Sequence, residues 1–178
     1  MIKYIYLLIV GLLLIPSCYK KKVLCNGIKG DLIGLTINDF IIKKYEHIYW
    51  DDSRGFMGDC GSKYIFHEIN YNFVNESNKE PEFYNDIDKE KYRLNSIFIS
   101  SRIINLTEYN SIVKALSNMQ ATAPIAMKYQ ISEGIEKDAL VWYMENYKLI
   151  LIYPKGKSGR YSIAILPLKH EYDKFLTK

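Results

Sequence analysis

The last third of the chain constrains the fold most strongly, because apolar and β-branched runs there alternate with residues that favour turns. The runs are residues 139–144, 147–153 and 160–166. Glu145-Asn146 between the first two runs fits a tight turn, since Asn tolerates a positive φ. Residues 154–159 hold the proline, glycine and serine of a second turn. Three consecutive strands with such short connections predict an antiparallel meander.

Two amphipathic helices are expected earlier in the chain. Thr36 has the side chain of an N-cap and is followed by apolar residues at helical spacing, which predicts a helix over residues 36–46. Thr107 is the expected N-cap of a second helix, which should end before Pro124. The remaining elements expected are strands over residues 63–73 and 92–104 and a polar loop over 75–88.

These elements predict an α+β fold in which short helices cover an antiparallel β-meander. The length of 178 residues suits one ordinary domain or two very small ones, and a single globular domain is the expectation. Leu35-Thr36 and Leu106-Thr107 match at an offset of 71 residues, so one interpretation is two tandem helix-plus-sheet units, residues 31–104 and 105–168. The other interpretation is that any two capped amphipathic helices look alike.

Residues 1–17 predict an export signal. An apolar run from Tyr4 to Ile15 follows Lys3, and as a helix it would span about 18 Å, against about 30 Å of bilayer hydrocarbon. The ending Ile15-Pro16-Ser17-Cys18 resembles the lipobox of bacterial lipoproteins. This resemblance implies cleavage after Ser17 and attachment of lipid, including palmitate, to Cys18.

An ordinary cleaved signal peptide or a retained N-terminal anchor is the alternative. Lys20, Lys21 and Lys22 follow the apolar run, and the positive-inside rule would keep this more basic side in the cytoplasm. In a lipoprotein the same lysines would lie at the headgroups of an anionic leaflet. The lipoprotein interpretation predicts a lipidated tether at residues 18–30 and a globular domain at 31–178. It places the protein in the bacterial cell envelope, membrane-anchored and facing the periplasm or the cell exterior.

The three cysteines agree with export. Once Cys18 carries lipid, Cys25 and Cys60 remain as an even pair and are the candidate disulfide. Two unpaired thiols are the alternative. A zinc site that combines this pair with His47 and His67 lacks the short ligand spacing of such sites, so no metal is expected.

No pattern in the chain matches a catalytic or cofactor site. The Gly-Lys-Ser segment at 156–158 lacks the first glycine of a phosphate loop and precedes a predicted strand, so it indicates a turn. Asp51, Asp52 and Asp59 lack the alternating spacing of a calcium loop and indicate a solvated acidic loop. The net charge of +4 rests mainly on lysine rather than arginine, so no nucleic-acid partner is expected. The sequence therefore predicts a protein that is not an enzyme.

Two aromatic pairs, Tyr49-Trp50 and Trp142-Tyr143, are the candidate partner-binding residues. Neighbouring side chains of a strand point to opposite faces, so at most one ring of each pair belongs to the core. The outward ring of each pair is a candidate anchor for a protein partner, since Trp and Tyr dominate binding hot spots. Packing in the core or at a sheet edge is the alternative for each ring.

An exported chain in which Gly34-Leu35-Thr36 opens a helix ahead of a β-meander resembles the small lipoproteins and inhibitors of the β-lactamase-inhibitor-protein type. The resemblance implies helix-plus-sheet modules that bind proteins on a sheet face, and no functional residue is carried over from it. The expected function is a lipid-anchored, non-catalytic protein-binding module, acting as an inhibitor, immunity or assembly factor. The alternatives are a small envelope hydrolase whose cleft gathers His47, His67 and carboxylates, and a carrier with an interior cavity for an apolar ligand.

Overall fold

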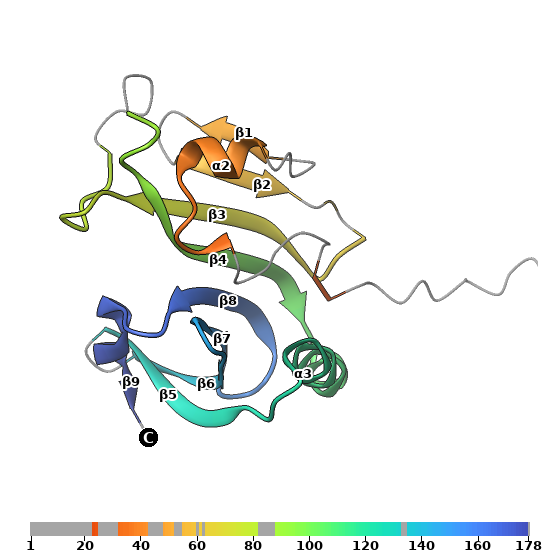
Figure 1. The fold of residues 1–178 in the computed structure, drawn as a ribbon. Helices are drawn as coiled ribbons and strands as arrows, with labels where there is room; N and C mark the ends of the chain where they lie inside the picture. Colours follow the sequence, from red (N-terminus) through yellow and green to blue (C-terminus); the bar gives the residue numbers. More distant parts are fainter. Residues whose placement is uncertain are drawn as a thin grey trace, which may run out of the picture.

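The computed structural model describes residues 23–24, 32–42, 48–51, 55–59, 61, 63–81, 88–132 and 135–177. Within these ranges the helices are α2 (Ile37–Ile42), α3 (Leu106–Gln120) and the 3-10 helix η2 (Glu171–Phe175). The strands are β1 (Ile48–Asp51), β2 (Gly55–Asp59), β3 (Phe66–Val74), β4 (Arg93–Ile104), β5 (Ile125–Ser132), β6 (Ile135–Tyr143), β7 (Tyr147–Tyr153), β8 (Gly159–Pro167) and β9 (Leu176–Thr177). The α+β fold dominated by an antiparallel meander is confirmed (Figure 1).

All described strands join one antiparallel sheet in the order β1-β2-β3-β4-β8-β7-β6-β5-β9. A helix followed by four meander strands occurs twice along the chain, first from α2 to β4 and then from α3 to β8. The two meanders meet where β4 pairs with β8, with Ile97 opposite Ile165. At this seam the backbone N of Tyr161 donates to Ser101 Oγ at 2.8 Å. The descent of both units from one duplicated sequence stays a prediction.

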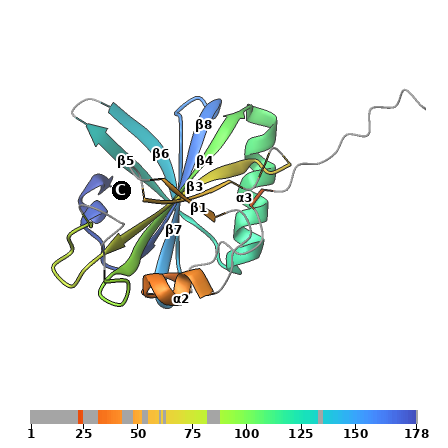
Figure 2. The same ribbon diagram turned by 90° about the horizontal axis from the view of Figure 1, so that it is seen from above.

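Both α-helices, α2 and α3, pack on the same face of the sheet, which holds the larger core (Figure 2). The Phe40 ring of α2 is fully buried, with its centroid 4.7 Å from that of Tyr71 and 5.3 Å from that of Phe73. Ile112 and Leu116 of α3 are fully buried as well. Their spacing of four residues places both on one side of the helix, so the amphipathic pattern read from the sequence is the packing face.

A second core lies on the opposite face, in the C-terminal half of the sheet. Its buried members are Ala139, Val141, Ile150, Ile152, Ala164 and Leu166. The partly buried Tyr129 and Leu176 pack against it, and η2 lies on this side (Figure 2). Because β7 is buried on both faces, residues 147–153 form a nearly continuous apolar run rather than an alternating one.

The first turn of α3 differs from the sequence expectation. Its N-cap is Asn105, not Thr107. Asn105 Oδ1 accepts a hydrogen bond from the backbone N of Glu108, while the Glu108 carboxylate accepts one from the backbone N of Asn105. This reciprocal capping box satisfies the backbone amides of Asn105 and Glu108. Thr36 is confirmed as the cap of α2, where its Oγ1 accepts from the backbone N of Asp39 at 3.1 Å.

Four strands, β1, β2, β5 and β9, were missed by sequence reasoning. The acidic loop expected around Asp51 and Asp59 is instead the β1–β2 hairpin. Gly58 allows β2 to approach β3, since a Cβ there would lie 3.2 Å from Ile69 Cδ1. β5 follows Pro124 directly, where no strand was expected, and β9 adds two residues at its outer edge.

The turns of the C-terminal meander lie where the sequence places them. Lys157 adopts a left-handed φ of 54° in the β7–β8 turn, and its backbone N donates to the Pro154 carbonyl at 2.8 Å. The turn at Glu145 and Asn146 forms, but neither residue has the positive φ that Asn146 was expected to provide. The hairpin is therefore held by its flanking strands rather than by a residue in the left-handed region.

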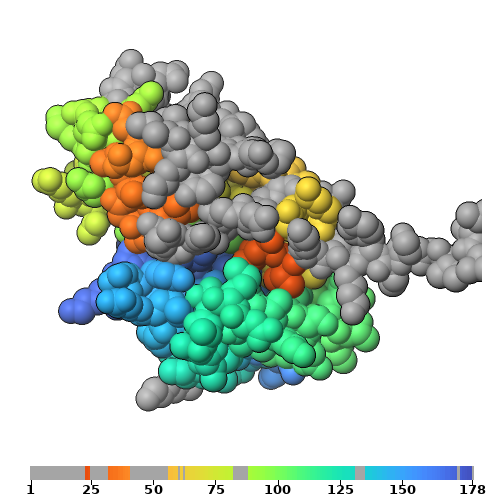
Figure 3. Space-filling view, turned by 45° about the vertical axis from the view of Figure 1, so that its right-hand side comes forward, coloured from red at the N-terminus to blue at the C-terminus, as the bar shows by residue number. Residues whose placement is uncertain are grey.

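Val23 and Leu24 belong to the globular body. The Val23 carbonyl accepts from the backbone N of Phe66 at 3.1 Å, and Leu24 is buried in the larger core. Figure 3 shows this segment wedged beside α3. The tether was expected to span residues 18–30, but the chain already contacts the globular body at Val23. No helix within the described ranges is long and apolar enough to cross a membrane.

Candidate functional site

The face of β2, β3 and β4 opposite the helices carries the candidate site, and we call it the open face. Its members are Met57, Asp59, Glu68, Asn70, Asn72, Phe98 and Ser100. The strands set these side chains in two rows across the sheet. Met57, Asn70 and Phe98 are opposite one another in register in the first row, and Asp59, Glu68 and Ser100 in the second. Neither α2 nor α3 lies on this face, and η2 lies on the same side of the sheet but against its C-terminal half (Figure 2).

The alternation of β3 produces the open face. Ile69, Tyr71 and Phe73 point into the larger core and are nearly fully buried, whereas Asn70 and Asn72 between them are only partly buried. A strand with period two places such residues on opposite faces. One face of this half of the sheet therefore packs on the helices, and the other presents polar side chains.

Two carboxylates face each other on the open face. Asp59 and Glu68 are exposed and directly opposite in the β2–β3 register. Asp59 Oδ1 accepts from the backbone N of Gly61 at 2.7 Å, and the nearest ring nitrogen to Glu68 is His67 Nε2, at 4.0 Å. Like charges directly opposite each other on neighbouring strands are destabilising. Neither of the two rows contains a lysine or arginine, so the pair is acidic on a chain whose net charge is +4.

A third carboxylate lies at the far end of the open face. Asn72 Nδ2 donates to Glu80 Oε1 at 2.8 Å, which attaches the loop after β3 to this surface. Phe98 lies between Asn70 and Ala164 in register and contacts the second core. A partly buried aromatic ring with an amide beside it and a row of carboxylates next to it on the sheet resembles the apolar centre and polar rim of a protein interface.

A β-bulge in β4 forms a polar corner beside the open face. Asn72 is opposite Ser96 and Phe73 is opposite Leu94, so Asn95 is the extra residue. The Asn95 amide lies 2.9 Å from His170 Nε2 in the segment before η2. The Ser96 hydroxyl is fully buried and has no hydrogen-bond partner in the described part of the chain.

Lys148 secures the same C-terminal segment. It is only 1% exposed, and its Nζ donates to the Leu168 carbonyl at 2.9 Å and pairs with the Asp173 carboxylate. Asp173 Oδ2 also accepts from the backbone N of His170. Burial lowers the pKa of His170, and the nearby Lys148 charge adds to that shift, against Glu171 and Asp173. These contacts hold the C-terminal segment against β4 and β7.

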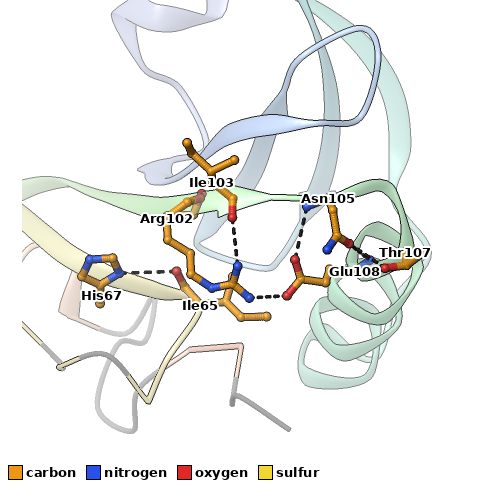
Figure 4. Close-up of polar contacts among 8 residues, drawn as sticks. Ile65, His67, Arg102, Ile103, Asn105, Thr107 and Glu108 are labelled. Carbon is orange, nitrogen blue, oxygen red and sulfur yellow. Dashed lines mark hydrogen bonds and ion pairs between the residues drawn. The ribbon is translucent and has the colours of Figure 1, made fainter. Parts of the chain in front are cut away.

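A third polar cluster joins the end of β4 to α3 (Figure 4). The Arg102 guanidinium pairs with Glu108 and donates from Nη1 to the Ile103 carbonyl at 2.9 Å. Glu108 at the same time completes the capping box with Asn105. His67 Nδ1 lies 3.5 Å from the Ile65 carbonyl. His67 is thus a partly buried strand residue, as its place beside Phe66 predicts.

Three tyrosines pack between α3 and the β7–β8 hairpin. The Tyr109 hydroxyl donates to that of Tyr153 at 3.2 Å, and Tyr161 donates to the Lys157 carbonyl at 2.8 Å. Burial raises the pKa of Tyr153, with its bond to Tyr109 contributing, and burial raises the pKa of Tyr161 to about 12. Lys157 Nζ lies 4.3 Å from the centre of the Tyr109 ring. The phenols of Tyr153 and Tyr161 stay protonated at neutral pH, and the three rings pack the hairpin against the helix.

Of the four aromatic residues predicted to bind a partner, Trp142 and Tyr143 differ in their burial. Trp142 is fully buried, with its Nε1 donating to Ser117 Oγ at 3.3 Å, so it is withdrawn as a contact residue. Tyr143 is 46% exposed on the opposite face and stays a candidate. Tyr49 and Trp50 lie in β1, opposite Met57 and Phe56, and their side chains are outside the described part.

The remaining predicted positions are Cys18, Cys25, Cys60 and His47, which all lie outside the described residues. Among the residues that are described, no group of three or more His, Cys, Asp or Glu side chains could hold a metal ion. The Gly-Lys-Ser segment at 156–158 is a turn, as expected.

Sequence reasoning missed the open face and Lys148. The signals were present in both cases. The alternation of Asn70 and Asn72 with apolar residues indicates a half-exposed strand, and a lysine inside the apolar run 147–153 indicates a buried cation.

Comparison with known proteins leaves the function to be argued from this geometry. No family model matches the chain, and no curated protein and no solved structure matches it at a significant level.

Proposed function

We propose that this chain is a lipid-anchored protein of the bacterial cell envelope that binds another protein through the open face, without catalysing a reaction. The observation that carries the proposal is the opposed pair Asp59 and Glu68, which forms no ion pair with a lysine or arginine among the described residues. Repulsion between the two carboxylates lowers the stability of the free protein. Such a cost is typical of a functional site, where a bound partner offsets the repulsion.

The chemistry of the open face describes the partner. The row of Asp59 and Glu68 favours lysine or arginine side chains, which would offset the repulsion between the two carboxylates. The neighbouring row of Met57, Asn70 and Phe98 offers an apolar centre with an amide beside it. The partner is therefore a protein with a basic patch next to an exposed apolar side chain.

The anchor supports this role by holding the open face at a membrane surface. It rests on the lipobox-like segment that ends at Cys18 and on the three lysines at 20–22. Inhibition, immunity and envelope assembly all require a stationary binding surface of this kind.

Charge reversal on the open face tests the binding. The full-length lipidated chain carrying Asp59→Lys and Glu68→Lys is compared with wild type and with Glu145→Lys, which reverses an exposed carboxylate in the β6–β7 turn. All three are cross-linked in the membranes of the source cells and purified. A partner protein should be captured by wild type and by the Glu145 control, and lost in the double variant. Salt should elute it, because the contact is ionic.

Capture that the double variant retains would refute the open face as the binding surface. Recovery of small molecules alone would refute the protein partner. Circular dichroism checks that the double variant is folded, which is expected because both side chains are exposed.

The anchor has its own test. Cys18→Ala should release the protein from the membrane fraction, with Cys25→Ala as the matched control that leaves it bound. Membrane association that survives Cys18→Ala would refute the lipid anchor.

A further inference from the structure

The globular body begins very close to the proposed lipid attachment. Val23 is fixed to the start of β3 by its carbonyl bond with Phe66, and Leu24 is buried beside it. Only five steps along the chain separate Cys18 from Val23, which at about 3.3–3.6 Å each reach at most about 18 Å. A domain of this size is about 40 Å across, so such a short link leaves one end of the body at the bilayer.

The register of the sheet identifies that end. Phe66, which holds Val23, is opposite Ser101 near the end of β4, and the backbone N of Arg102 donates to the Ile65 carbonyl. In Figure 1 the short segment of residues 23–24 lies where β4 ends and α3 begins, and Figure 2 shows the β7–β8 turn at the same end. The anchored end therefore combines the end of β4, the start of α3 and the β7–β8 turn.

Two large apolar side chains project from this end. Ile103 is 67% exposed and Leu106 is 59% exposed, which makes them the most exposed large apolar residues in the described part of the chain. Ile103 is two residues beyond Ser101, and Leu106 opens α3. Exposed apolar residues beside a membrane attachment point are suited to the boundary between headgroups and acyl chains.

Three cationic side chains lie at the same end of the molecule as these two residues. Arg160 is opposite Ile103 in the β4–β8 register, and Lys63 and Lys155 are exposed at the same end. None of the three forms a salt bridge with another described residue. The acidic Glu108 is neutralised by Arg102. Together with the lysines at 20–22, these charges complement an anionic leaflet.

We infer that this end of the molecule is seated on the lipid bilayer, with Ile103 and Leu106 inserted at the headgroup boundary. The inference rests on the proposed anchor at Cys18 and adds to it a fixed orientation of the body. It also places the row of Asp59 and Glu68 close to the membrane surface, because Glu68 is two residues beyond Phe66 in β3. A partner bound at the open face would then itself be membrane-bound or membrane-proximal.

Photo-cross-linking to lipid tests the orientation. The photoreactive residue p-benzoylphenylalanine replaces Leu106 in the full-length lipidated protein, which is reconstituted in vesicles of phosphatidylglycerol and phosphatidylethanolamine with a tagged acyl chain. Met119 is the matched control position, because it lies at the other end of α3, about 20 Å away, and is 52% exposed. Cross-linked lipid should be several-fold more abundant at position 106 than at position 119. The same excess is expected at position 103, which serves as the second probe.

Equal labelling at positions 106 and 119, in protein that floats with the vesicles, would overturn the orientation and leave the anchor standing. Protein that fails to float with the vesicles would overturn the anchor and the orientation together. Circular dichroism of each variant confirms that the labelled protein is folded.

Discussion

The buried ammonium of Lys148 leads to a sharp prediction about stability. Replacing Asp173 by alanine removes the carboxylate but leaves the charge of Lys148 in place, 1% exposed and bonded only to the Leu168 carbonyl. Breaking a buried ion pair from one side costs about 3–5 kcal/mol. Asp173 itself is 43% exposed, so water replaces part of the lost interaction. We therefore expect Asp173→Ala to lower the free energy of unfolding by about 3 kcal/mol, at the low end of that range.

Lys148→Met should behave differently, because it removes the charge itself. The new side chain would lie opposite Leu166, at the end of the second core. Replacing a buried ion by an apolar group of similar size is often neutral, so we expect a loss below about 1 kcal/mol. In the Lys148→Met protein, Asp173→Ala should cost less than about 0.5 kcal/mol. The coupling energy between the two sites should thus be about 2–3 kcal/mol.

Urea unfolding of the four proteins measures this cycle. The fluorescence of Trp142, which is fully buried, reports the loss of the core. For a domain of this length, 3 kcal/mol corresponds to a fall in Tm of about 6–12 °C. A loss in Asp173→Ala no larger than that in Lys148→Met, or two losses that simply add, would refute the buried-charge reasoning.

Asn105→Ala should lower the free energy of unfolding by about 1 kcal/mol by removing the cap of α3, whereas Thr107→Ala should change it by less than about 0.5 kcal/mol; urea unfolding that gave equal losses would contradict the cap assignment. Burial lowers the pKa of His170 below its usual 6.5, so the unfolded chain takes up this proton first as the pH falls. Stability should therefore decline below about pH 6.5, and His170→Gln should flatten that part of a profile of unfolding midpoint against pH. Burial raises the pKa of Tyr153 and Tyr161 above their usual 10.0, so the stability they contribute is complete below pH 10 and is lost as the pH rises further. Tyr153→Phe should reduce this alkaline loss, and an unchanged profile of unfolding midpoint against pH would contradict the role of Tyr153.

The C-terminal meander is readable from sequence because its strands are buried on both faces. The run 147–153 is the observed β7 to the residue, and 160–166 differs from β8 by one residue at each end. Burial on both sides demands apolar residues at nearly every position, and that signal is local. The helix positions follow for a similar reason, since their apolar faces repeat with the helical period.

The missed strands carry no such local signal. β5 includes Lys128 and Gln130, and its stability comes from pairing with β6, where Lys128 Nζ bonds Asp138 at 2.6 Å. The β1–β2 hairpin is hidden by its aspartates and glycines, which favour turns when they are read without their neighbours. Both assignments depend on partners that are distant along the chain.

The open face was also beyond local reasoning. The opposition of Asp59 and Glu68 is a consequence of the β2–β3 register. Nothing in the sequence aligns two residues from separate strands. The capping box of α3, in contrast, could have been found, because Asn105 and Glu108 have the required spacing of three.

The pairing of β4 with β8 makes the two halves of the protein dependent on each other. Each of these strands is the last of its meander, and each completes the other's backbone hydrogen bonds along residues 97–100 and 162–165. A chain severed at Asn105 would yield two fragments, each exposing one edge of a long strand, β4 in the first fragment and β8 in the second, with unsatisfied amides and carbonyls. Each fragment would offer the other the strand edge that matches its own unpaired edge. Neither water nor a shorter strand can form all of those hydrogen bonds. Complementation of the two pieces in trans, or their aggregation through this strand, would follow from the topology alone.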